Sequence, residues 1–135
     1  MTLAIQTPAP GKLGLWAGRA MSGLVVLFLA MDAGMKLLDL QPVRDAAVQI
    51  GWPVALDRTL GVIGLTCLML YAVPRTAVLG AILTTGLLGG AVAAHLRLGD
   101  PLFSHVLFGV YIGLLAWGGL YLRDERLRAL LPLRD

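Results

Sequence analysis

The sequence predicts an all-α membrane protein, a four-helix transmembrane bundle of up-down topology with a short amphipathic helix in its first outer loop. Of its 135 residues, 58% are hydrophobic and 14% are charged, whereas soluble domains carry about 25% charged residues. The apolar residues gather into four stretches of about 20 residues, the length with which a helix crosses the hydrocarbon core. Because lipid offers no hydrogen bonds to the backbone, helices are the expected spanning form.

The four spans are expected at 15–38, 55–73, 76–95 and 102–122, within one domain that covers residues 1–135. The first apolar run is longer than the roughly 7–15 residues of a secretory signal, which predicts a retained span. Only Pro74-Arg75 separates the second span from the third, so these two should form a hairpin. Asp100-Pro101 is typical of a helix start, with Asp as the cap and Pro in the first turn.

The loop between the first two spans predicts the short amphipathic helix at 42–50. Val43, Ala46, Ala47 and Ile50 share one face of this segment, as helical spacing requires. Gly51-Trp52-Pro53 follows and indicates a helix stop and a turn.

Basic residues predict the orientation of the bundle, because cytoplasmic loops carry an excess of Lys and Arg. The inner side carries seven of them: Lys12, Arg19, Arg75, Arg123, Arg126, Arg128 and Arg134. The outer side carries four: Lys36, Arg44, Arg58 and Arg97. Both termini are therefore expected in the cytoplasm. The basic residues flank apolar spans and form no nucleic-acid motif, so the expected partner is the lipid bilayer and not nucleic acid.

Polar residues that face the bundle interior are expected where three spans meet the outer side. Asp32 and Lys36 close the first span, and their i, i+4 spacing with the acid first favours an ion pair. Counted at about 1.5 Å per residue from Trp16, Asp32 lies about 24 Å along the helix, inside the hydrocarbon edge. A carboxylate there must be paired, protonated or in a wet cavity, and ionisable groups at that depth indicate a functional site. The alternative is a local pair in which Lys36 snorkels outwards.

Two histidines are expected at similar depth, one on each side of the third loop. His95 shares a helical face with Thr84 and Leu88, and His105 begins a stripe of small residues that predicts an inward orientation. A neutral histidine beside a carboxylate can hold a hydrogen-bonded ligand or relay a proton. Asp32, Lys36, His95 and His105 are therefore the ligand-binding candidates. Two plain interfacial histidines are the alternative.

Three further polar residues are secondary candidates: Arg97, Asp100 and Ser104. Arg97 and Asp100 are expected to form a solvated ion pair that fixes the third turn. Ser104 and His105 are not expected to act as a nucleophile and its general base, because adjacent residues on a helix point about 100° apart. With no complete catalytic set, the sequence leaves open whether the protein is an enzyme.

Neither a metal nor a haem is indicated. The histidines lack helical HxxxH or ExxH spacing, and the single Cys67 excludes an intrachain disulfide and a CxxC redox pair. Glycines at i, i+4 spacing predict close helix packing, either inside the bundle or in a homo-oligomer. These pairs are Gly14 and Gly18, Gly86 and Gly90, and Gly109 and Gly113.

The chain resembles the DoxX-like family of small four-helix bacterial membrane proteins. Three stretches carry the resemblance: GRAMSGLVVLFLAMDAGMKLL, LMLYAVPRTAVLGAILTTGLLGGAVAAHLRLGDPLFSHVLFGVYIGLLAWGGLYLRD and RLRALLP. They cover nearly all of the chain from Gly18 to Pro132, and HLRLGDPLFSH is the most specific segment. The resemblance implies a bacterial cytoplasmic (inner) membrane location.

Relatives in the wider superfamily include subunits of a thiosulfate:quinone oxidoreductase, and others are linked to oxidative-stress complexes. The resemblance thus implies a subunit of a quinone-linked membrane redox system with a redox complex as partner. The cofactor stays unknown, with quinone as the candidate, and the polar cluster predicts a small-ligand pocket near the outer face. The alternatives are a non-enzymatic membrane scaffold or assembly factor and, less favoured, a small transporter.

Overall fold

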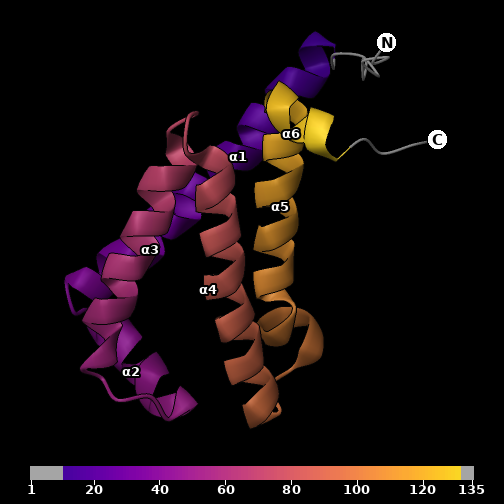
Figure 1. Ribbon diagram of the computed structural model, residues 1–135. Coiled ribbons are helices and arrows are strands. Elements are labelled where there is room, and N and C mark those ends of the chain that lie inside the picture. The colour runs from indigo at the N-terminus through magenta and orange to yellow at the C-terminus, as the bar shows by residue number, and fades with distance from the viewer. Residues whose placement is uncertain (1–10, 132–135) are drawn as a thin grey trace.

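A computed structural model describes residues 11–131, and every regular element in that range is a helix (Figure 1). The elements are α1 (Lys12–Leu37), α2 (Gln41–Ile50), α3 (Leu56–Ala72), α4 (Ala77–Leu98), the π-helical turn η1 (Leu102–Val106), α5 (Phe108–Arg123) and α6 (Glu125–Leu130). Arg134, which was counted toward the inner side, and Pro132 of the last matching stretch lie outside the described residues.

Three helical stretches in this range are long and apolar enough to cross a membrane. They are Lys12–Leu37, Ala77–Leu98 and Leu102–Arg123, the last combining η1 and α5. The 17 residues of α3 rise about 26 Å. The structure therefore establishes an all-helical protein with helices of membrane length, while a fourth crossing and the up-down topology stay predictions.

The expected spans differ from the observed helix ends by three residues or fewer. The short helix of the first loop is confirmed as α2, and it ends at Gly51, whose φ of 76° is the left-handed conformation that glycine adopts freely. The helix start at Asp100 is wrong in detail. Pro101 precedes η1 without a side-chain cap, because the carboxylate of Asp100 is bonded to His95 instead.

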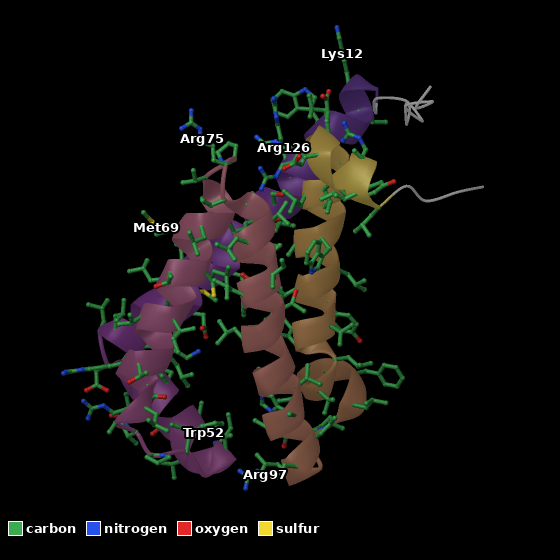
Figure 2. All side chains as sticks on the ribbon, in the orientation of Figure 1. Lys12, Trp52, Met69, Arg75, Arg97 and Arg126 are labelled. Carbon is green, nitrogen blue, oxygen red and sulfur yellow. The ribbon has the colours of Figure 1, made fainter. Side chains whose placement is uncertain are left out.

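The four long helices pack in a ring, in which α1 and α4 each contact both α3 and α5. Figure 1 shows α6 beside the first turns of α1, and α2 at the opposite end of the molecule. We call these the α6 end and the α2 end. Lys12, Arg75 and Arg126 lie at the α6 end, and Trp52 and Arg97 lie at the α2 end (Figure 2).

Glycines bring the helix backbones into contact toward the α6 end. A Cβ added at Gly80 would lie 2.2 Å from the backbone nitrogen of Tyr71, so α4 and α3 touch there. A Cβ at Gly119 would lie 2.6 Å from the hydroxyl oxygen of Ser22, so α5 and α1 touch likewise. Small residues permit such approaches between membrane helices.

A buried polar network joins three helices at this contact. The hydroxyls of Ser22 and Tyr71 lie 3.0 Å apart, and Tyr71 donates to the carbonyl of Ala116 at 2.7 Å. Arg123 donates through Nε to Ser22 at 2.9 Å, and its guanidinium lies 5.3 Å from the centre of the Tyr71 ring. The hydroxyls of Ser22 and Tyr71 are thus both paired, as is usual for polar groups removed from water.

The outward faces of the helices are apolar. Large hydrophobic side chains stay exposed along α1, α3 and α4, among them Leu24, Leu27, Met31, Val62, Met69 and Ile82. Exposed apolar surface of this extent marks contact with lipid or with another protein, which agrees with helices of membrane length.

Candidate functional site

The buried stripe of α1 ends in an ion pair at the α2 end. Gly18, Ser22, Val25, Leu29 and Ala33 are buried. The half-buried Asp32 and Lys36 flank this stripe at its end, Asp32 three residues after Leu29 and Lys36 three residues after Ala33. Residues at this spacing share one helical face. The ammonium of Lys36 donates to Asp32 at 2.5 Å, and the two side chains keep 21% and 31% of their surface exposed. The expected pair is confirmed, on the face that points into the bundle.

The buried stripe of α4 ends in a histidine at the same end. Ala77, Ala81, Thr84 and Leu88 are buried, again at spacings of four and three. Ala91 is exposed, and the half-buried Val92 and His95 follow Leu88 at spacings of four and three. His95 thus continues the face of α4 that packs into the bundle. Its Nδ1 lies 2.6 Å from a carboxylate oxygen of Asp100, which fixes the ring and directs Nε2 away from that partner.

The second histidine lies beside the first but not inside the bundle. The ring centres of His95 and His105 are 5.9 Å apart in an edge-to-face arrangement. His105 is exposed, whereas its neighbour Val106 is buried, so the expected inward orientation of His105 is wrong. The cause is η1, because a π-helical turn holds one more residue than an α-helical turn and shifts the facing residue.

Ser104 and Arg97 take roles that spacing alone did not predict. Ser104 lies 2.7 Å from Nδ1 of the adjacent His105. Arg97 forms no ion pair with Asp100 among the described residues, against the expected pair, because its guanidinium donates to the carbonyl of Ile50 at 2.6 Å. Arg97 thereby ties α4 to the end of α2.

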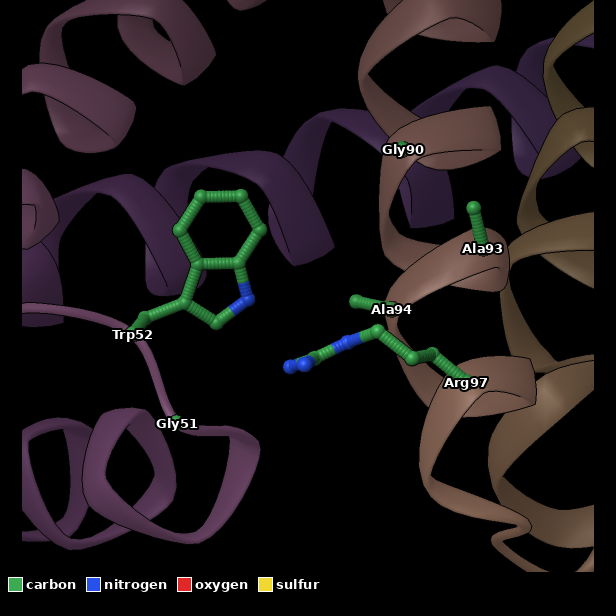
Figure 3. A pocket seen from close by; sticks show the side chains of 6 residues that line it. All are labelled: Gly51, Trp52, Gly90, Ala93, Ala94 and Arg97. Carbon is green, nitrogen blue, oxygen red and sulfur yellow. The ribbon is translucent and has the colours of Figure 1, made fainter.

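A cleft of about 440 Å³ opens between the α2–α3 connection and α4. Figure 3 shows the indole of Trp52 facing Ala94 and the guanidinium of Arg97 across it. Gly51, Gly90 and Ala93 complete the lining. His95 is not part of the lining, since it follows Ala94 by about 100° around the helix.

Sequence reasoning missed Asp57 as a candidate, although it is a buried acidic group at this end. Asp57, Gly61 and Gly64 are buried on one face of α3, and a Cβ at Gly61 would lie 3.1 Å from the Cβ of Lys36. Asp57 lies one turn along this face from Gly61. It is only 4% exposed, and its Oδ2 has no hydrogen-bond partner. The signal was available, because Asp57 begins the stripe of small residues on α3.

A separate set of charges holds the corner between α1, α2 and α3 on the outside. Arg44 donates from Nε to Asp39 at 2.8 Å and makes a second bond to the other carboxylate oxygen. Arg58 approaches Asp39 to 4.0 Å while 73% of its side chain is exposed. The hydrogen bond from Arg44 lowers the pKa of Asp39 and raises the pKa of Arg44. The neighbours Asp57 and Arg58 thus point to opposite sides.

The arrangement offers donors and acceptors to a ligand but no metal cage. Three helices contribute side chains from their interior faces at the α2 end: Asp32, Lys36, Asp57 and His95. These side chains can form hydrogen bonds or exchange protons. Within residues 11–131, no three of His, Cys, Asp and Glu gather in a group that could hold a metal ion.

Comparison with known protein families identifies a match over most of the chain. The model of the DoxX-like family matches residues 20–119. No curated protein and no solved structure matches the chain. The matched segment contains α3, α4 and η1 in full, most of α1 and α5, and every interior group at the α2 end. The chain therefore belongs to the DoxX-like family.

Proposed function

We propose that this protein binds a small lipophilic ligand with a hydrogen-bonding head group, of the quinone type, inside the α2 end of its helix bundle. The observation that supports the proposal is the course of the buried stripes. Those of α1 and α4 are apolar or small over most of their length, and the half-buried Asp32, Lys36 and His95 follow them at the α2 end. Ionisable groups on interior faces at membrane depth are characteristic of ligand and proton sites.

Each group has a role in this proposal. The Lys36 ammonium, oriented by Asp32, donates to a carbonyl oxygen of the head group. His95, oriented by Asp100 through Nδ1, exchanges a proton with the ligand through Nε2. His105 lies at the rim, 5.9 Å from His95 between ring centres. The apolar cleft beside Trp52 provides the approach from the lipid.

The proposal extends to the cellular setting. The excess of basic residues at the α6 end supports the proposal that this end lies in the cytoplasm of a bacterium, with the site toward the outer leaflet of the inner membrane. No complete catalytic set accompanies the site. The protein therefore acts as the ligand-binding membrane subunit of a redox system, with electron transfer carried by a partner.

The variants His95→Ala and Asp32→Ala are expected to weaken quinone binding, each by about tenfold or more, because each removes a charged or charge-oriented hydrogen bond. The measurement is titration of the detergent-purified protein with a short-tailed benzoquinone, followed by quenching of tryptophan fluorescence. Gln49→Ala changes an exposed residue of α2 and serves as the control. Unchanged dissociation constants in both site variants would reject the proposal.

A scaffold or assembly role is the second candidate, and one face of α4 favours it. Cβ atoms added at Gly86, Gly89 and Gly90 would meet no atom within 4 Å. Such a face suits another membrane helix, from a second copy or a partner. We expect gentle solubilisation of native membranes to yield a complex larger than the monomer. A chain that elutes alone at monomer size counts against this candidate.

A further inference from the structure

We propose that Asp57 is a third ligand-facing group of the interior site, and that the ligand must bring it a hydroxyl donor. This inference rests on the proposed function, since it concerns the same site and the same class of ligand. The site therefore prefers to bind the reduced, hydroxyl-bearing form of the head group.

Asp57 lies close to the contact between Lys36 and α3. Asp57 lies on the same face of α3 as Gly61, and Gly61 is the residue against which Lys36 packs, with 3.1 Å between the Lys36 Cβ and an added Cβ. Its carboxylate is therefore within one helical turn of the Lys36 contact. Arg58 is directed outward toward Asp39 and gives Asp57 no counterion.

One carboxylate oxygen of Asp57 has no hydrogen-bond donor among the described residues. Buried polar groups are almost always hydrogen-bonded, and a carboxylate accepts hydrogen bonds but, when ionised, donates none. Oδ2 of Asp57 is buried and has no donor among the described residues. The nearby ammonium of Lys36 is bound to Asp32 at 2.5 Å. A ligand that enters the site can therefore satisfy Asp57 only by supplying a donor.

The location selects the kind of donor. An ammonium carried by a ligand would have to be stripped of water to reach Asp57, which is only 4% exposed, and this desolvation is costly. A hydroxyl on an apolar ring partitions from lipid far more readily, and its bond to a carboxylate is a strong, charge-assisted one. A ligand with both hydroxyl and oxygen acceptors fits Asp57 and Lys36 together.

The test compares two probes that differ only in this donor: a benzoquinone with a ten-carbon tail and its hydroquinone, both titrated anaerobically into the detergent-purified full chain. The native protein is expected to bind the hydroquinone about tenfold more tightly than the quinone. In Asp57→Asn the ratio should fall to about one, because the amide also donates and serves either form. Asp57→Ala should weaken the hydroquinone and leave the quinone unchanged.

The controls separate this inference from the proposed function. Arg58→Gln alters the exposed neighbour and should preserve the native ratio. Equal affinity of the native protein for both forms, or an unchanged ratio in Asp57→Asn, would overturn the role of Asp57 while leaving quinone binding intact. Binding of neither form would overturn the proposed function itself. Because the native ratio is informative alone, a variant that fails to fold does not block the test.

Discussion

Gly80→Ala is expected to destabilise the protein by about 3 kcal/mol or more, at the upper end of the range for overpacked sites. The added Cβ would lie 2.2 Å from the nitrogen and 2.5 Å from the Cα of Tyr71. Both are backbone atoms, so no side-chain rotation relieves the overlap, and α3 and α4 must separate. The separation would also disturb the hydroxyl of Tyr71, which bonds Ser22 and Ala116.

Thermal unfolding in detergent, followed by circular dichroism, measures this effect. Gly86→Ala and Gly89→Ala are matched controls on the same helix, because their added Cβ atoms would meet nothing within 4 Å. These controls should hold or raise the midpoint, since alanine has the higher helix propensity by about 1 kcal/mol. The expectation is wrong if Gly80→Ala unfolds at the temperature of either control.

Lys36→Met is expected to destabilise the protein by about 1–3 kcal/mol by leaving Asp32 without its cation. Removing one partner of a fully buried pair costs about 3–5 kcal/mol, and the partial exposure of both side chains reduces this figure. The double variant Asp32→Asn, Lys36→Met should recover most of the loss, because a neutral pair leaves no charge to be compensated.

The same unfolding measurement distinguishes this effect from a simple loss of surface charge. Arg58→Met removes a basic residue at the same end of the molecule. The side chain of Arg58 is 73% exposed, and its distance of 4.0 Å from Asp39 makes a weak ion pair. Its midpoint should stay near that of the native protein. If the double variant is as unstable as Lys36→Met alone, the ion pair is not the cause.

Most of the helical architecture could be predicted from the sequence, because lipid imposes a length on every apolar run. The boundaries of α1, α3, α4 and the combined η1 and α5 followed from this length and from Pro74, Pro101 and Gly51. The π-helical turn could not be predicted. It holds one more residue than an α-helical turn and leaves His105 exposed beside the buried Val106, which accounts for the error in the orientation of His105.

The candidate site was predicted in part. The i, i+4 pair of Asp32 and Lys36 is a local interaction, and local spacing is sufficient to predict it. The bonds of Arg97 to Ile50 and of His95 to Asp100 depend on which carbonyl or carboxylate the fold brings near. The partner of Arg97 was therefore mispredicted, and the partner of His95 was missed. Asp57 lay in the first turn of a span next to Arg58. At that position, only the row of buried residues on α3, which packs against α1, distinguishes an inward residue from an outward one.

The close contact at Gly80 also fixes where His95 stands. Gly80 and Tyr71 hold one end of α4 against α3, and Arg97 bonds the other end to Ile50. Between them, an added Cβ at Gly109 of α5 would lie 3.1 Å from the carbonyl oxygen of Leu88 in α4. A helix that is held at three points along its length presents its side chains in one position before any ligand arrives. A site on such a rigid element loses little binding free energy to ordering.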